Sequence, residues 1–177
     1  VVLRFVPGVA SRVREATWHP TQSLETEADG SLRWRATVSG TIEIEGEPAI
    51  EIRGHGLRDH SWGPRYWQST PSYRWITGNF GDDLGMVISI VGDHIGGVFH
   101  KGQELLRITG VDLETDYESG TNYHSVLRAN VTLADGAKHR GEGRVRGFIP
   151  LRNRRAGQNT HIGEGMTEWR CGDRTGY

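Results

Sequence analysis

The feature that most constrains the fold of this sequence is a set of glycine-containing pairs that separate short apolar segments. The pairs are Asp29-Gly30, Gly81-Asp82, Gly92-Asp93, Gly96-Gly97 and Asp135-Gly136. Asp-Gly and related pairs favour the tight turns of antiparallel hairpins, because glycine readily adopts a positive φ. Glycine is abundant (25 residues) and proline scarce (6 residues), which agrees with a chain built mainly from hairpins. No βαβ pattern occurs beyond residue 20, and this disfavours a doubly wound sheet.

Between these turns, apolar and polar residues alternate with a period of two, as in strands with one buried face. The alternation predicts strands at residues 1–7, 32–38, 42–52 (with a turn at Gly46), 73–80, 84–91, 95–100, 104–117, 122–133, 139–149 and 161–170. Residues 8–17 are predicted to form one short helix, with Val9 and Val13 on one face, and residues 152–160 a polar loop. The expected fold is mostly β: an antiparallel barrel or half-barrel with a short N-terminal strand-helix appendage.

Charge and composition narrow the possible partners. The net charge of −1 gives no overall field that would recruit nucleic acid or an anionic membrane. No run of about 18 apolar residues is present, so no membrane-spanning helix is expected. The basic run from Lys138 to Arg155 is interpreted either as solvated strand faces or as an anion-binding patch. Only Phe148 supplies an aromatic ring there, which argues against stacking on single-stranded nucleic acid.

The single cysteine, Cys171, excludes an internal disulfide framework. Together with the lack of a signal peptide it favours a reducing compartment, so a cytoplasmic location is expected. The chain starts at Val1 and stops at Tyr177 just after a strand-like segment, which we interpret as a fragment of a longer protein. The oligomeric state is left open by the sequence.

The segment from Arg53 to Trp67 breaks the alternation and concentrates polar and aromatic side chains. Six of its residues are ionisable: Arg53, His55, Arg58, Asp59, His60 and Arg65. Trp62, Tyr66 and Trp67 lie among them. Loops rich in such residues often carry binding or proton-transfer sites, so this segment is the first candidate for function.

Residues 54–65, Gly-His-Gly-Leu-Arg-Asp-His-Ser-Trp-Gly-Pro-Arg, resemble the signature of a lipocalin-like superfamily. This superfamily includes bacterial hydroxyneurosporene synthases (carotenoid hydratases) and, more distantly, tocopherol cyclase. The resemblance continues at residues 39–42, 73–76, 80–82 and 163–170. It implies a lipocalin-like β-barrel over residues 39–177 that binds a hydrophobic, isoprenoid or lipid-like molecule. In a full-length parent it implies possible hydratase or cyclase chemistry. Family members resemble two barrels side by side, and only about one is present here.

Residues 1–44 resemble a different module, the C-terminal extension of WYL-domain transcriptional regulators. The similarity lies at residues 2–5, 9–15, 18–22 and 29–32. It gives a two-domain description, with residues 1–38 as a strand-helix-hairpin segment and 39–177 as the barrel. It also gives the alternative function, a ligand-sensing regulatory module.

Hydration of an alkene needs an acid, a group that stabilises the cation and a water-poor pocket. Asp59, His60, Trp62 and Asp82 have suitable side chains, because a carboxyl or His–Asp pair can donate a proton and a tryptophan face can stabilise a cation. The resemblance suggests further ligand-binding residues, namely His55, Arg58, Arg65, Trp67, Trp75 and Phe80. The alternative is structural: Arg58, Asp59 and Arg65 would pin the loop by ion pairs, while Trp62 and Trp67 would plug the barrel. We expect neither a metal site nor a cofactor, because the eight histidines lack ligand spacing such as His-Glu-x-x-His.

Overall fold

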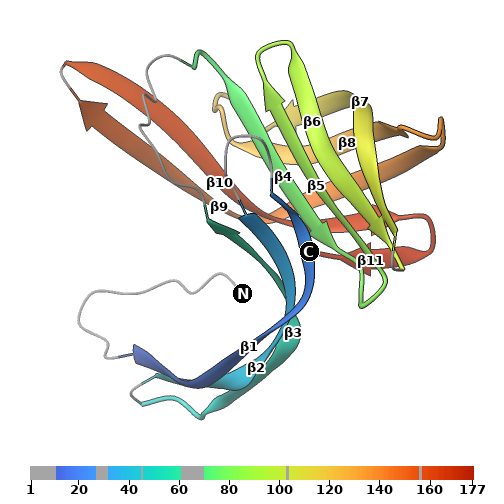
Figure 1. Ribbon diagram of the computed structural model, residues 1–177. Helices are drawn as coiled ribbons and strands as arrows, with labels where there is room; N and C mark the ends of the chain where they lie inside the picture. The colour runs from blue at the N-terminus through green and yellow to red at the C-terminus, as the bar shows by residue number, and fades with distance from the viewer. Residues whose placement is uncertain (1–10, 27–31, 45, 61–69, 103, 156) are drawn as a thin grey trace. The chain divides into compact units, whose positions relative to one another are not determined.

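The computed structural model describes the backbone of residues 11–26, 32–44, 46–60, 70–102, 104–155 and 157–177 (Figure 1). Side chains are described for residues 39–44, 46–57, 70–102, 104–154 and 157–177. Within these ranges every regular element is a β-strand. The chain divides into two compact units, residues 1–63 and 64–177. The boundary predicted between residues 38 and 39 falls inside β2 (Leu32–Ile44) and stays a prediction.

The first unit is a three-stranded antiparallel sheet of β1 (Ser11–Thr26), β2 (Leu32–Ile44) and β3 (Ile50–His60), in the order β1-β2-β3. The predicted turn at Gly46 joins β2 to β3, and Gly46 has a φ of 84°. The helix predicted over 8–17 is wrong from Ser11 onward. Val13 and Thr17 are β-branched, and β1 pairs with β2 through Val13 opposite Ile42, so strand pairing overrides the weak helical pattern. Residues 1–10 lie outside the described part.

The second unit is an eight-stranded antiparallel sheet that follows chain order. Its strands are β4 (Tyr73–Asn79), β5 (Leu84–Val91), β6 (His94–Lys101), β7 (Glu104–Tyr117), β8 (His124–Leu133), β9 (Lys138–Arg155), β10 (Gln158–Cys171) and β11 (Arg174–Gly176). Three predicted turns carry glycines with positive φ, at Gly81 (104°), Gly92 (56°) and Gly136 (87°). The mostly β, antiparallel barrel-like fold predicted from the sequence is therefore confirmed.

The sheet nearly closes on itself where its first and last strands meet. Asn79, at the end of β4, and Tyr177, just after β11, exchange two backbone hydrogen bonds of 2.7 and 3.2 Å. Gly176 makes this approach possible, because a Cβ there would lie 2.7 Å from the carbonyl carbon of Asn79 and closer still to its oxygen. Since β11 has three residues and β4 has seven, closure is confined to one end of β4.

The concave face of this sheet carries the core. Its largest fully buried side chains are Trp169, Phe99, Ile88, Ile108 and Leu133. The ring of Trp169 lies over two glycines of β9: a Cβ on Gly143 would come within 2.9 Å of that ring, and one on Gly141 within 3.5 Å. The glycines of β9 thus make room for the aromatic side chain of β10.

Two local predictions in this unit are wrong. Gly96-Gly97 is not a turn but part of β6, where a Cβ on Gly97 would lie 3.0 Å from the carbonyl carbon of Val87. This glycine pair serves a close strand approach. Residues 152–160 are not a loop, because β9 and β10 stay paired up to Arg155 and Gln158 (Figure 1). Polar side chains there reflect an exposed hairpin rather than irregular backbone.

Candidate functional site

The residues predicted from the signature segment fall in the first unit or outside the described residues. Trp62, Arg65 and Trp67 are not described. Arg58, Asp59 and His60 form the end of β3, where the backbone pairs with β2, and the structure does not describe their side chains. His55 is exposed on β3, opposite Thr37. The catalytic and binding roles assigned to these seven residues stay predictions.

The three predicted site residues of the second unit do not come together. Phe80 is buried in the core with 4% exposure, whereas Trp75 is 38% exposed and its side chain points to the convex face. Asp82 is exposed in the turn between β4 and β5. Its neighbour Asp83 binds Arg174 of β11 through both carboxylate oxygens, and the Arg174 guanidinium lowers the pKa of Asp83. This end of the barrel, which we call the Phe80 end, is held together by packing and an ion pair.

A different set of polar and aromatic side chains meets at the opposite end. Arg74 of β4 shares the concave face with Ile76, two residues along the strand, and pairs with Ile90. Its Nη2 donates a 2.6 Å hydrogen bond to the hydroxyl of Tyr117, the last residue of β7. Because β5 and β6 separate β4 from β7 in the sheet, the two side chains reach each other across the concave side. We call this end the Arg74 end.

His124 joins this group through an irregularity in β8. The register between β7 and β8 shifts so that Tyr117 pairs with His124, and Ser125 is skipped. Cross-strand partners project on the same face, so His124 lies beside Tyr117. The pKa of the His124 imidazole is lowered, first by burial and second by the positive charge of Arg74. Both effects favour the neutral form of the His124 imidazole.

A pair of stacked aromatic rings lies beside His124. Phe148 of β9 stacks on Tyr123, with ring centroids 4.5 Å apart, and meets His124 edge-on at 4.8 Å. Glycines of β10 make space for both rings: a Cβ on Gly163 would lie 2.6 Å from the Phe148 ring, and one on Gly165 would lie 3.2 Å from Cδ2 of His124. The group at the Arg74 end thus draws residues from four strands and the turn before β8. They are Arg74, Tyr117, Tyr123, His124 and Phe148.

Burial changes along the same strands from one end to the other. Core side chains near the Phe80 end are 1–4% exposed, as for Phe99, Trp169 and Phe80. Partly buried apolar side chains lie toward both ends: Ile90, Val111, Leu113 and Val145 toward the Arg74 end, and Leu84, Leu106 and Cys171 near the Phe80 end. Tyr117 itself is 46% exposed. The apolar lining therefore continues toward the Arg74 end without being fully covered there.

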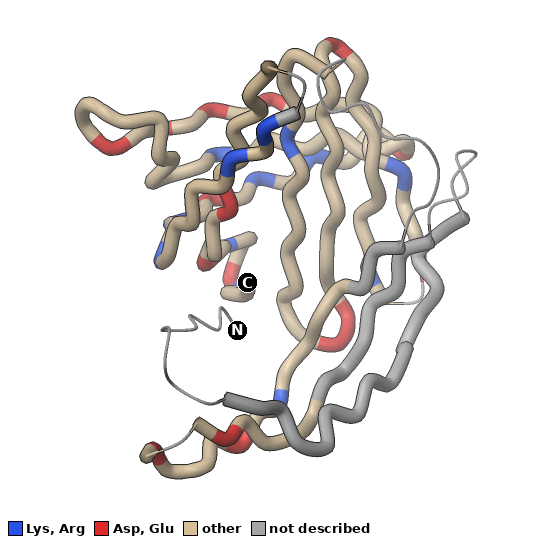
Figure 2. Tube along the Cα trace, turned by 90° about the vertical axis from the view of Figure 1, so that its left-hand side faces the viewer, with Lys and Arg blue, Asp and Glu red and all other residues tan. Residues whose placement is uncertain are grey.

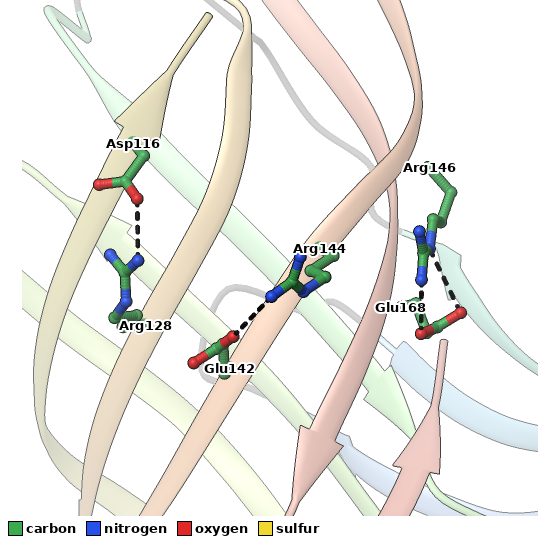
Figure 3. A network of polar contacts seen from close by, with 6 residues as sticks. All are labelled: Asp116, Arg128, Glu142, Arg144, Arg146 and Glu168. Atoms are coloured by element: carbon green, nitrogen blue, oxygen red, sulfur yellow. Dashed lines mark hydrogen bonds and ion pairs between the residues drawn. The ribbon is translucent and has the colours of Figure 1, made fainter.

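The convex face carries a separate set of charges that pair with each other. Asp116 binds Arg128 at 2.9 Å, Arg146 binds Glu168 at 2.9 Å and Glu142 lies 3.8 Å from Arg144 (Figure 3). Figure 2 shows acidic and basic positions interspersed along the described strands. Arg144 and Arg146 belong to the basic run found in the sequence, and both have acidic partners, as expected for solvated strand faces.

Among the described residues, no three His, Cys, Asp or Glu side chains are grouped so that they could hold a metal ion. Cys171 is partly buried, and burial raises the pKa of its thiol, which disfavours the reactive thiolate. What the arrangement at the Arg74 end offers is a cation, a hydroxyl, an imidazole and aromatic faces next to an apolar lining.

Sequence reasoning missed this group for a specific reason. By strict alternation Tyr117 shares a face with Val111 and Leu113, as the pairing shows, whereas His124 would share a face with Arg128. The skipped Ser125 moves His124 to the other face, and a bulge of this kind has no sequence signal here. Arg74 carried one available signal: a charge at a period-two position otherwise filled by Ile76 and Gly78.

Comparison with known families gives one match. A family described as "Domain of unknown function (DUF7064)" covers residues 13–177. The chain belongs to this family. The match includes parts of both segments that resembled different families in the sequence. No curated protein and no solved structure matches the chain. No helix among the described residues is long and apolar enough to cross a membrane.

Proposed function

We propose that the eight-stranded barrel of this DUF7064 protein binds a hydrophobic small molecule, isoprenoid or lipid-like, on its concave face toward the Arg74 end. The observation that carries the proposal is the change along the concave face. The large side chains of Phe80, Phe99 and Trp169 are fully buried near the Phe80 end. Toward the Arg74 end, Ile90, Leu113 and Val145 are only partly buried, next to a group of polar and aromatic side chains. Sites for small molecules typically combine an apolar lining with a few polar groups that fix orientation.

The proposal is confined to binding. Of the residues that the resemblance assigns to hydratase or cyclase chemistry, Asp82 is exposed in the turn at the Phe80 end, and the side chains of Asp59, His60 and Trp62 lie outside the described residues. The regulatory alternative concerns residues 1–44, and no contact in the described part favours it.

A pair of tryptophan substitutions on one strand tests the location of the ligand. Thr115 pairs with the buried Leu127, so its side chain projects on the concave face, whereas Glu114 projects on the convex face. We expect the uncharged dye Nile red to bind the wild-type protein with enhanced fluorescence. Thr115→Trp should weaken this binding at least tenfold by filling the interior, and Glu114→Trp should leave it unchanged. No dye binding to the wild type, or equal effects of both substitutions, would contradict the proposal.

A further inference from the structure

Arg74 is a cation on the concave face with a neutral partner. Its side chain is partly buried, and among the described residues it makes one hydrogen bond, to the hydroxyl of Tyr117. Arg128 and Arg146 of the convex face and Arg174 instead bind carboxylates. An arginine in a partly apolar setting is stabilised by a bidentate anion, since its planar donors match two oxygens. A bound ligand would therefore be the source of the anion that pairs with Arg74.

Among the described side chains, no carboxylate forms an ion pair with Arg74 or His124. On β7, Asp116 is turned to the convex face and held by Arg128. Phe148 is the β9 residue in ring contact with His124. On β10, Glu164 acts on Tyr73, whose pKa is raised by burial and by that carboxylate, but Glu164 forms no ion pair with Arg74. Asp93 and Glu118 lie in the turns at this end, and within the described residues none of these acids forms an ion pair with Arg74.

We propose that the hydrophobic ligand carries a carboxylate, which binds the Arg74 guanidinium and the Tyr117 hydroxyl, while its apolar chain lies along the partly buried concave face. This inference rests on the proposed function and names its ligand class. Tyr123 and Phe148 present stacked rings beside the headgroup position and pack against the first carbons of the chain. The positive charge that lowers the pKa of His124 is then offset by the bound carboxylate, so binding raises that pKa again.

Three probes with the same twelve-carbon chain separate headgroup from chain: dodecanoate, 1-dodecanol and dodecyltrimethylammonium. Each is titrated below its micelle concentration against the Nile red complex at pH 7.5. We expect dodecanoate to displace the dye at a concentration at least tenfold lower than dodecanol, and the cation to be the weakest. If dodecanol displaces the dye as well as dodecanoate does, the carboxylate inference is overturned and hydrophobic binding stands. If no probe displaces it, the carboxylate inference is overturned as well, and the Thr115→Trp comparison alone decides on hydrophobic binding.

Substitutions then assign the effect to Arg74. Arg74→Met should abolish the preference for dodecanoate over dodecanol while dodecanol binding persists, and Arg74→Lys should retain part of the preference. Arg107→Met is the matched control, because Arg107 lies on the convex face opposite Val98 and is exposed. Unchanged preference in Arg74→Met would refute the role of Arg74. Urea unfolding of each variant checks that the barrel is intact.

The titration of His124 by NMR provides a readout that a purely structural role of Arg74 would not move. Its imidazole signal is assigned by its loss in His124→Gln. We expect the pKa of His124 to rise when dodecanoate is bound and to stay unchanged with dodecanol. A pKa that does not respond to dodecanoate would place the carboxylate away from this group and overturn the inference.

Discussion

The two ends of the eight-stranded barrel are built from the same strands and differ in the burial and polarity of their concave-face side chains. At the Phe80 end, Phe99 and Trp169 are 1% and 2% exposed, and the first and last strands are joined by backbone hydrogen bonds. At the Arg74 end, the concave face carries Arg74, Tyr117 and His124, all at least partly exposed. One end is completed by side-chain packing, and the other leaves polar groups and apolar surface only partly covered.

This difference suggests that residues at the Phe80 end determine the stability of the sheet and residues at the Arg74 end its binding properties. Close packing of large side chains contributes most of the stability of a small domain, and polar groups in partly buried positions contribute little or reduce it. Loops and rims therefore can carry binding groups when the rest of the scaffold is well packed. The comparison predicts that substitutions at the Phe80 end lower stability and that those at the Arg74 end mainly change binding.

The largest expected effect is that of Trp169→Ala, which removes a buried indole from the Phe80 end. Such truncations cost about 3–5 kcal/mol of unfolding free energy, because they leave a cavity as well as losing apolar burial. Phe148→Ala, at the Arg74 end, should cost clearly less, since its ring is only partly buried. Urea unfolding followed by circular dichroism measures both. Similar losses for the two variants would show that the ends are equally packed, contrary to the comparison.

A smaller loss of stability is expected when the close approach of β11 to the end of β4 is prevented. Gly176→Ala places a Cβ against the backbone of Asn79, so we expect a loss of about 1–3 kcal/mol, as for other overpacked sites. Gly147→Ala is the control, because a Cβ there meets nothing within 4 Å and Gly147 does not have a positive φ. Amide hydrogen exchange of Asn79 should accelerate in Gly176→Ala alone. Unchanged exchange would mean that closure does not depend on this glycine.

Much of the barrel could be predicted from the sequence, because its strands obey one simple rule. The period-two alternation placed β4, β5 and β7 within one residue of their observed bounds, since each strand buries one face. Turn glycines at 81, 92 and 136 were equally readable, because a positive φ is inexpensive only for glycine. The three-residue β11 was not predicted, since its place depends on the distant Asn79.

The candidate site was much less predictable than the strands. The signature segment drew attention by composition, but its side chains lie largely outside the described residues. The group at the Arg74 end depends on a register shift at Ser125 and on β4 and β7 facing each other across the sheet. Neither property is local in sequence, so no pattern in a single strand could bring Arg74, Tyr117 and His124 together.

The smallest expected effects concern the pH dependence of stability, and they have different ranges at the two ends. At the Phe80 end, Arg174 lowers the pKa of Asp83 in the folded state, so their pairing stabilises the fold above the ordinary Asp pKa of about 4. This contribution is lost as the pH falls through the lower, folded-state pKa. The difference in unfolding midpoint between wild type and Asp83→Asn should therefore be present at pH 6 and shrink below pH 4. A constant difference would argue against the ion pair as its source.

At the Arg74 end the pKa of His124 is also lowered in the folded state, but here the proton-bound form is charged. The unfolded chain therefore binds a proton more readily below the ordinary His pKa of about 6.5, and the fold loses stability as the pH falls from 7 toward 5. His124→Gln should remove this slope. The unfolding midpoint of the variant should therefore rise relative to that of the wild type as the pH decreases. In Arg74→Met, the part of the pH dependence that His124 still causes reflects its burial, because the charge of Arg74 is absent. If Arg74→Met alone leaves the His124 slope unchanged, the guanidinium does not act on the imidazole, and the polar groups of this end are neighbours without electrostatic coupling.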